Sequence, residues 1–555
     1  MGRLPHVPPD IRLDARAPGR PLRVVLLAFY TYQSHAMRIF HPLLRQRGHD
    51  VHSIFFKNFG TYQRPTQREE EMVLDLVEAL EPDLVCMSVW STYYKLAARL
   101  TDGIRRRTAA PVIWGGIHAQ TLPRDCLRHA DIVCKAEGEL VLADLTDRLS
   151  VGEGYEDLPG AWVRVGDEVR ENPSRLFLPS LDVLPLPDLS PENKYYLGFE
   201  EWLDVESWDA EAVSYDIMMS RGCPYRCTFC IHNFTRARFD DLGTYVRRRS
   251  VEHCLAELRA AKARYPKLRA VAFSDDIFAP PRPWLEEFCE RYKREIGLPF
   301  VMYSFPGMVD EKKVRLMRDA GLWCTTMGIQ SGSERIRRDC YERETSNETI
   351  LNACRIFARH GVVRNLDFIG DNPYETVEDR RETLELLLDL PKPFYFNRFS
   401  LTWFPGVALT ERALRDGFIR EEDLEQNAEK GYRLWGSMLL DERPPEELYW
   451  DVLYAMAVHG FPRPVVHALM EAPFFRKHLY RFARLLRGVR RFARWKSRLV
   501  DALVGRPNLY AQYLRDLYRK HVRTTAVLHP NFDNSPFSVP IRRKAPEREG
   551  QPAAP

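Results

Sequence analysis

The sequence predicts an α/β protein with two successive runs of alternating strands and helices, followed by a helical C-terminal region. Short apolar runs alternate with amphipathic stretches between residues 21 and 150, and the alternation returns between residues 211 and 420. Three closely spaced cysteines open the second run. After residue 420 only helical periodicity continues, so residues 421–540 are predicted to form a helical cap.

The first run predicts a Rossmann-like, doubly wound parallel sheet. Its strand candidates are bulky apolar runs, as in strands that are buried on both faces. They are residues 22–29, 51–56, 83–88, 111–114 and 132–134, separated by helix candidates at 34–47, 69–80 and 95–107. Ligands of such sheets bind at the carboxyl ends of the strands, so the loops that follow the strands are the candidate site.

The loops after the third and fourth strands have distinctive residues. Ser88 and Trp90 end the third strand, and Gly115 and Gly116 end the fourth. A glycine pair at this position lets a flat, bulky ligand come close to the backbone. The fifth strand is followed by residues 136–139, Ala-Glu-Gly-Glu.

The cysteines that open the second run are Cys223, Cys227 and Cys230, in the spacing C-x3-C-x2-C. Thiolates are soft ligands that favour iron–sulfur clusters or zinc. Three thiolates leave one iron of a 4Fe–4S cluster without a protein ligand, and that iron can bind a substrate or cofactor. Two alternatives remain open: a zinc site completed by a distant residue, and three unrelated structural cysteines.

This spacing, with Phe229 just before the last cysteine, resembles the signature of the radical S-adenosylmethionine (SAM) superfamily. The resemblance implies that the open iron binds SAM, and that one electron from the cluster cleaves it to methionine and a 5′-deoxyadenosyl radical. It also implies a partial (β/α)6 barrel of the TIM type. Six strand candidates match that expectation: residues 214–219, 270–274, 300–304, 324–330, 362–369 and 395–403.

Residues just past these strands resemble further family elements. Asp275 and Asp276 resemble a D-D-x-F element, which implies contacts to SAM or substrate; a helix N-cap is the open alternative. Gln330 and Ser331 stand in a G-I-Q-S-G-S stretch where the family usually has Glu instead of Gln. Two further positions are implied as SAM contacts, Arg343 and the turn at Gly370. A solvated surface charge is the open alternative for Arg343.

The first run resembles the cobalamin-binding domain of a subset of this superfamily. An S-x-L element followed by a Gly pair corresponds to Ser88, Trp90, Gly115 and Gly116, with Trp replacing Leu. Residues 136–139 resemble a G-E-G-E element. The D-x-H-x-x-G motif that supplies a lower cobalt ligand is absent, although His35 lies in the corresponding loop. The alternative is a sheet that only packs and binds nothing.

The bulk properties limit the remaining possibilities. A net charge of +4 over 555 residues does not indicate a nucleic-acid partner. The 11 cysteines have no disulfide-framework spacing, which favours a reducing cytoplasmic compartment. The eight cysteines outside the triplet are interpreted as small buried residues. No apolar run reaches the roughly 18 residues needed to span a bilayer, and residues 1–20 do not resemble a signal peptide.

The other segments are less informative. Residues 1–20 and 541–555 are predicted to be disordered, and the Pro-punctuated segment 151–210 to be a linker. Helices are expected at 446–459, at 464–470 and around 510–518. Residues 476–495 form a basic amphipathic pattern, which predicts either a helix packed on the barrel or one that contacts an anionic membrane surface.

The resemblance as a whole implies a cobalamin-dependent radical SAM methyltransferase acting on an unactivated carbon of a small molecule or natural product. It implies a 4Fe–4S cluster, SAM and cobalamin as cofactors, and an electron donor such as flavodoxin or ferredoxin as partner. One alternative is an enzyme of the same build that cyclises, oxidises or rearranges its substrate. Another is a non-enzymatic cobalamin or redox sensor.

Overall fold

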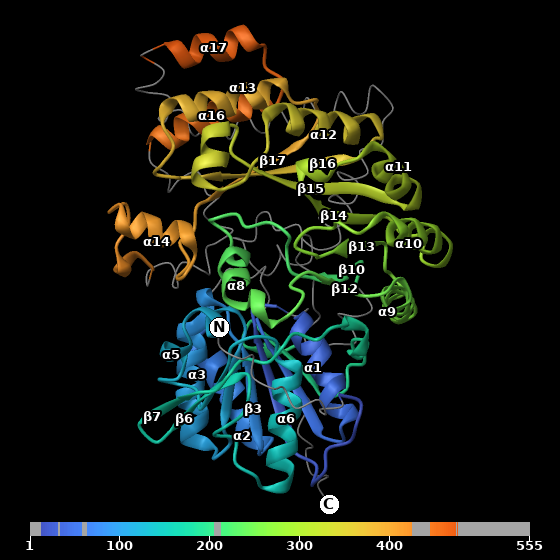
Figure 1. Cartoon of the computed structure of the whole chain (residues 1–555), viewed down its shortest axis with the longest axis vertical. Helices are drawn as coiled ribbons and strands as arrows, with labels where there is room; N and C mark the ends of the chain where they lie inside the picture. Colours follow the sequence, from blue (N-terminus) through green and yellow to red (C-terminus); the bar gives the residue numbers. More distant parts are fainter. Residues whose placement is uncertain are drawn as a thin grey trace, which may run out of the picture.

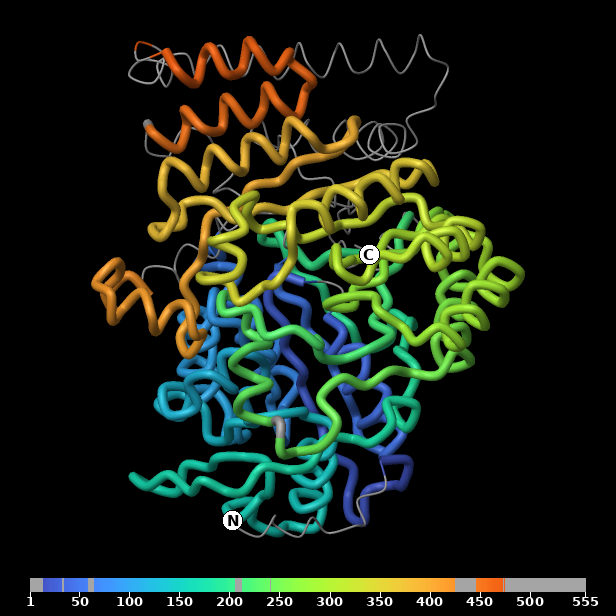
Figure 2. The backbone as a smooth tube through the Cα atoms, turned by 45° about the horizontal axis from the view of Figure 1, so that its top comes forward, coloured from blue at the N-terminus to red at the C-terminus, as the bar shows by residue number. Residues whose placement is uncertain are grey.

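Two α/β units follow each other along the long axis of the molecule, and further helices lie beyond the second unit (Figure 1). This computed structural model describes residues 13–31, 34–57, 64–204, 212–424, 445–472 and 474. The segment from residue 212 to about 250, green in Figure 2, runs between the blue first unit and the yellow second unit. The segment that contains the cysteine triplet therefore lies where the two units meet.

The first unit is built on a nine-stranded sheet in the order β7-β6-β5-β4-β3-β1-β2-β8-β9. Its centre is parallel and consists of β1 (Arg23–Phe29), β2 (Asp50–Phe56), β3 (Leu84–Ser88), β4 (Val112–Gly115) and β5 (Ile132–Cys134). β1 pairs with β2 on one side and β3 on the other, so the strand order reverses there. The predicted doubly wound sheet is confirmed, with this reversal at the position where such sheets bind ligands.

Helices cover both faces of this sheet. On one face lie α1 (His35–Gln46) and α6 (Glu139–Val151), and on the other α2 (Gln67–Ala79) and α3 (Tyr94–Arg107). The alternate residues of β1 separate into two hydrophobic clusters, one against each helix pair. This double burial explains why the strands are continuous apolar runs.

The segment predicted to be a linker, residues 151–210, instead contributes four strands to this sheet. β6 (Ala161–Val165) pairs antiparallel with β5 and forms a hairpin with β7 (Glu168–Glu171). β8 (Lys194–Gly198) extends the other side, parallel to β2, and β9 (Glu201–Trp202) pairs antiparallel with β8. Short strands near the sheet edges are partly exposed, so they lack the apolar run that identifies a central strand.

The N-terminal prediction also differs from the structure. Residues 13–20 were expected to be disordered, but they pack on the first unit. The Ala17 backbone N–H donates to the Arg47 carbonyl (2.9 Å), and that of Arg20 to Ser150 (3.1 Å). Leu13 is buried beside Leu43. Residues 1–12 lie outside the described residues.

A buried ion pair stabilises the start of α2. The Glu69 carboxylate accepts hydrogen bonds from Lys57 Nζ (2.7 Å) and from the backbone N–H of Thr66 (2.9 Å) and Glu200 (3.2 Å). Both charged side chains are almost fully buried. Glu69→Ala would leave the buried Lys57 ammonium without its carboxylate partner. We expect this substitution to lower the free energy of unfolding by about 3–5 kcal/mol. Thermal or urea unfolding of the purified protein measures this loss.

The matched control is the next residue, Glu70, whose ion pair with Arg99 (2.6 Å) lies at the surface. Glu70→Ala should cost less than about 1 kcal/mol. Equal stability of the two variants would show that the Lys57–Glu69 pair does not stabilise this unit.

The second unit is a sheet of six parallel strands in sequential order: β10 (Ser214–Ile217), β13 (Ala270–Phe273), β14 (Phe300–Ser304), β15 (Leu322–Gln330), β16 (Val363–Gly370) and β17 (Tyr395–Ser400). All six predicted strands are present, with ends shifted by three residues at most. Five helices follow the strands in turn: α9 (Val251–Arg264), α10 (Arg282–Glu295), α11 (Glu311–Ala320), α12 (Asn347–Arg359) and α13 (Val377–Asp389). β10 and β17 are not paired with each other, as expected of a partial barrel.

After β17 the chain forms α14 (Ala408–Arg415), which contacts the cysteine-bearing loop through the Leu409 N–H and the Thr228 carbonyl (2.9 Å). Two later helices, α16 (Pro445–Val458) and α17 (Arg463–Glu471), lie beyond the barrel (Figure 1). The last two confirm the helices expected at 446–459 and 464–470, and α16 packs beside α13 (Figure 1). The basic segment 476–495, the helix expected around 510–518 and the tail 541–555 lie outside the described residues. In the part of the chain that is described, no helix combines the length and apolar character needed to cross a membrane.

Candidate functional site

The cysteine loop begins directly after a short two-stranded ribbon. β11 (Ser220–Arg221) pairs antiparallel with β12 (Arg247–Arg248), and Gly222 then leads into Cys223. Gly222 has a φ of +85°, and a Cβ there would lie 2.4 Å from the Tyr245 carbonyl oxygen. Only glycine permits this close approach. The loop ends where α8 (Ile231–Phe239) begins, between the two units (Figure 1).

The three cysteines lie together in this loop. Cys223 and Cys227 are buried, Cys230 is half-buried, and the Cys230 backbone N–H donates to the Cys227 carbonyl (3.0 Å). Burial raises the pKa of the Cys223 thiol to about 11 and that of Cys230 to about 12, and the neighbouring cysteines add to both shifts. Within the described residues, no three His, Cys, Asp or Glu side chains are close enough to hold a single metal ion.

Arg343, which lies between β15 and α12, contacts this loop. Its guanidinium donates to Cys227 Sγ (3.5 Å) and to the Gly328 carbonyl (2.5 Å), and it stacks over the Phe305 ring at 4.2 Å. The side chain is 7% exposed, so the surface-charge alternative for Arg343 is wrong. Arg343 thus places a buried positive charge directly beside the central cysteine of the triplet.

The two predicted aspartates differ in environment. Asp275 is fully buried and accepts hydrogen bonds from the Met219 backbone N–H (3.3 Å) and from the Ser220 hydroxyl. Burial raises its pKa to about 6. Asp276 instead pairs with His232 Nε2 (2.9 Å), just past the cysteine loop. Asp275 therefore supports the strand that delivers the loop, and neither aspartate acts as a helix N-cap in the structure.

Removing the Asp275 carboxylate should loosen the cysteine loop. Asp275→Ala leaves the Met219 N–H and the Ser220 hydroxyl without this buried acceptor, at a cost of about 1–3 kcal/mol. We expect lower iron incorporation during reconstitution, measured as iron bound per chain. Asp275→Asn keeps an acceptor oxygen and should bind more iron than the alanine variant. Wild-type iron content in Asp275→Ala would contradict this role.

The remaining barrel positions lie at the ends of β15 and β16. Gln330 ends β15 with a φ of +74°, an uncommon backbone conformation for a residue other than glycine. The Ser331 hydroxyl donates to Glu375 (3.1 Å), and burial raises the pKa of Glu375 to about 7. Gly370 ends β16, where a Cβ would lie 2.5 Å from Arg398 Nε. A larger residue here would have to displace the Arg398 side chain, which is buried and paired with Glu447 and Asp451.

Phe229 packs edge-on against Tyr341, with ring centroids 5.0 Å apart. It also lies in a small hydrophobic cluster with Ile336 and Leu409. These contacts attach the cysteine loop to the barrel wall. The eight other cysteines are all buried, as the sequence predicts.

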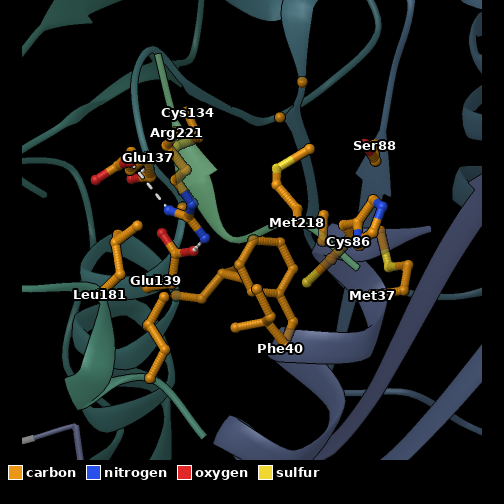
Figure 3. Close-up of a pocket in the computed structure, with 18 of the residues that line it drawn as sticks. Met37, Phe40, Cys86, Ser88, Cys134, Glu137, Glu139, Leu181, Met218 and Arg221 are labelled. Carbon is orange, nitrogen blue, oxygen red and sulfur yellow. Dashed lines mark hydrogen bonds and ion pairs between the residues drawn. The ribbon is translucent and has the colours of Figure 1, made fainter. Parts of the chain in front are cut away.

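A pocket lies between the strand ends of the first unit and residues of the second unit, among them Met218 and Arg221 just before the cysteine loop (Figure 3). It contains about 1340 Å³ of empty space, counting the part that is open to solvent. The first unit contributes the predicted positions His35, Ser88, Gly115 and Gly116. Trp90 is not among the lining residues, and its side chain is 57% exposed.

The walls of the pocket are largely apolar, with polar groups on two sides. Met37, Phe40, Leu181 and Met218 point into the space shown in Figure 3. A Cβ added at Gly115 would meet no atom closer than 3.9 Å, so the backbone is open to the pocket there. Burial and the cations Arg38 and Arg249 lower the pKa of His35 to about 3, which keeps its imidazole neutral.

Several lining residues were not identified as site residues from the sequence. They are Arg221 on β11, Arg249 after β12, and His253 and Glu257 on α9. Only Arg221 could have been suspected from the sequence, because it directly precedes Gly222 and the first cysteine of the triplet, Cys223. The others come from a helix of the second unit and from the short segment between β12 and that helix, so only the packing of the two units identifies them.

These residues fit the groups that the sequence implies. A flat, bulky ligand needs a wide space, an apolar lining and an open backbone edge, and the pocket provides all three. A neutral imidazole can coordinate a metal, and His35 provides one at this wall. The cysteine loop provides three thiols next to a buried guanidinium, a donor set suited to an iron–sulfur cluster.

Comparison with protein families identifies both units. Residues 24–146 match the model of the B12 binding domain, and residues 217–387 match that of the radical SAM superfamily. These ranges cover the first sheet up to α6 and the barrel from the cysteine loop through most of α13.

Individual relatives are distant. An uncharacterised methyltransferase from Pyrococcus horikoshii is 25% identical over 62% of this chain and 72% of its own length. The cobalamin-dependent radical SAM methyltransferase TokK from Streptomyces tokunonensis is 22% identical over 81% of this chain and 66% of its own length. The structure of the methyltransferase TsrM from Kitasatospora setae, with cobalamin and a [4Fe-4S] cluster bound, superimposes with a TM-score of 0.57. It is 18% identical and covers 71% of this chain and 75% of that one.

The two matched domains imply the cofactors of this protein. A radical SAM domain uses a 4Fe–4S cluster and SAM, and a B12 binding domain holds cobalamin. Each domain contributes its own part of the site, since the cysteines belong to the barrel and the strand-end loops to the first unit. The chain is therefore a radical SAM enzyme of the group that carries a cobalamin-binding domain.

Proposed function

We propose that this enzyme is a methyltransferase that acts on an unactivated carbon of a small molecule. One observation carries the proposal: the pocket at the strand ends of the B12 binding domain is also lined by residues that come just before the cysteine loop. Met218 and Arg221 line the pocket, and Arg221 is separated from Cys223 by one residue. A methyl donor held in the pocket would thus lie next to the site where SAM is cleaved.

When bound, the cluster and SAM supply the radical that removes hydrogen from a carbon, and the corrinoid supplies the methyl group. The chain positions these groups and excludes water from them. Cys223, Cys227 and Cys230 would hold the cluster, and Arg343 would hold Cys227 in position through its hydrogen bond to the sulfur. Gly115, Gly116, Ser88 and His35 would receive the corrinoid at the strand ends.

The inner face of the barrel supports a polar substrate. Burial alternates strictly along β16, and the residues of its less buried face include Asn365 and Asp367. Asn397 Nδ2 donates to both of these residues at 2.9 Å, and the Tyr303 side chain on β14 is 48% exposed. Asn365 and Asp367 lie before the carboxyl end of β16, inside the barrel. The hydrogen-bond donors and acceptors of this lining would recognise a substrate with hydroxyl or amino groups.

Two further elements of the proposal concern the environment of the enzyme. All 11 cysteines are free, which supports a reducing compartment such as the cytoplasm. A cluster that cleaves SAM must be reduced in each cycle, so an electron donor such as flavodoxin or ferredoxin is the expected partner.

The experiment uses SAM that carries a deuterated methyl group. Anaerobically reconstituted enzyme is incubated with this SAM, hydroxocobalamin, a reductant and a small-molecule extract of the native host. The proposal predicts 5′-deoxyadenosine together with a product that contains the labelled methyl group, and neither compound with Cys227→Ala. A product of altered mass without the label would instead indicate cyclisation, oxidation or rearrangement.

A further inference from the structure

Four charged side chains join the two units at the edge of the pocket. Arg221 and Arg247 are direct partners across the β11–β12 ribbon, and both reach the loop that follows β5. Arg221 donates to Glu137 (3.0 Å) and Glu139 (2.6 Å). Arg247 binds Glu137 through both terminal nitrogens (2.6 and 2.8 Å). We call these four residues the interdomain clamp; Figure 3 shows its Arg221 part.

The clamp is shielded from water. The side chains of Glu139 and Arg247 are 4% and 6% exposed, and those of Glu137 and Arg221 about one-fifth. Burial opposes ionisation of Glu137, yet the hydrogen bonds and charges of Arg247 and Arg221 hold its pKa below the usual value. Two-point arginine–carboxylate contacts of this kind have a fixed geometry, unlike exposed ion pairs.

Each end of the clamp lies at a functional position. Glu137 and Glu139 line the pocket, as Arg221 does itself. On the other side, only Gly222 separates Arg221 from Cys223, and the Tyr245 carbonyl closely confines Gly222. Arg247 is held in turn by stacking over Phe177 at 4.5 Å and by donating to the Leu178 carbonyl (3.0 Å). The loop that forms the pocket wall is therefore connected to the first cluster cysteine through a short series of fixed contacts.

We propose that the clamp couples occupation of the corrinoid pocket to the environment of the cluster, with Arg221 and Glu137 as positioning residues. This inference rests on the proposed function, because it requires that the pocket holds a corrinoid. A ligand that presses on residues 137–139 shifts Arg221, and Arg221 shifts the loop that carries Cys223. Coupling between two sites is reciprocal, so the state of the cluster must also change corrinoid affinity, by about 5-fold or more.

The test compares the cluster with and without corrinoid in the full-length, cluster-reconstituted protein. Samples are prepared with and without hydroxocobalamin and then treated with excess dithionite, which reduces both the corrinoid and the cluster, before the electron paramagnetic resonance spectrum of the reduced cluster is recorded. Corrinoid retention is measured on the same samples by absorbance after desalting. The variants are Glu137→Gln, Arg221→Gln and Arg221→Lys. The control is Glu171→Gln, which breaks the exposed Arg124–Glu171 pair in the same unit.

In wild type and Glu171→Gln, we expect corrinoid to change the cluster spectrum. Glu137→Gln and Arg221→Gln should retain iron and corrinoid but lose that change, and Arg221→Lys should restore part of it. If the clamp only held the fold together, Glu137→Gln and Arg221→Gln would have lower unfolding temperatures than wild type. Their cluster spectra would still change when corrinoid binds.

Three results would overturn the inference. The first is a corrinoid-dependent change in Glu137→Gln equal to that of wild type. The second is wild-type protein that retains corrinoid without any change in the cluster spectrum. The third is loss of corrinoid from Glu137→Gln at an unchanged unfolding temperature, which would make Glu137 a direct corrinoid contact. Wild-type protein that retains no corrinoid would refute the proposed function itself, and this inference with it.

Discussion

Replacing Cys227 with alanine is expected to abolish SAM cleavage completely. Cys227 is the central thiol of the triplet, is buried, and receives the Arg343 guanidinium at 3.5 Å. A cluster held by three thiolates loses a third of its protein ligands in this variant, and the remaining two cannot hold it at the barrel mouth. The measurements are iron content after anaerobic reconstitution and 5′-deoxyadenosine formed from SAM under reducing conditions.

The matched control for this substitution is Cys289→Ala. Cys289 is also a buried cysteine of the second unit, but it lies on α10 and packs in the hydrophobic core. Its truncation should cost little stability and leave iron content and SAM cleavage unchanged. If Cys227→Ala still formed 5′-deoxyadenosine, the assignment of the cluster to this loop would be wrong.

Replacing Gly115 with leucine should remove corrinoid binding. The added side chain starts at the carboxyl end of β4, where the backbone is open to the pocket, and it would occupy the space of the ligand. We expect at least a roughly hundredfold loss of affinity, which corresponds to about 2.8 kcal/mol. Absorbance titration of the reconstituted protein with hydroxocobalamin measures the change.

Two neighbouring substitutions separate this blocking effect from damage to the fold. Gly115→Ala adds a methyl group whose nearest neighbour, Cys134 Cβ, is an ordinary contact at 3.9 Å, so this variant should bind corrinoid nearly as wild type does. Gly116→Ala should instead destabilise the first unit, because Gly116 has a φ of +90° and a Cβ would lie 2.8 Å from the Val89 backbone. Wild-type affinity in Gly115→Leu would place the corrinoid elsewhere.

The strands that deliver the site could be predicted because burial on both faces imposes a simple pattern. In the first unit, β5 was predicted at its observed bounds and β2 and β4 within one residue. The cysteine loop was predictable for a different reason: the spacing of its ligands is local, so three residues within eight positions define it. Ser88 and the Gly pair follow from the rule that ligands bind at strand ends.

Other parts of the site depend on contacts between distant segments, which no local pattern encodes. Arg221 and Glu137 are 84 residues apart and meet only because the two units pack against each other. Arg343 follows a strand in an unremarkable charged stretch, and its burial against Cys227 results from the closing of the barrel. The resemblance of residues 88–90 to an S-x-L element predicts Trp90 as a site residue, but the exposed tryptophan does not line the pocket.

We propose that this single chain holds a corrinoid beside a cluster that cleaves SAM. The most direct test is anaerobic: the protein is reconstituted with iron, sulfide and hydroxocobalamin, desalted, and its absorbance spectrum recorded before SAM and dithionite are added. We expect corrinoid bands that remain after desalting and 5′-deoxyadenosine in the same sample. Formation of 5′-deoxyadenosine by protein that retains no corrinoid would contradict this proposal.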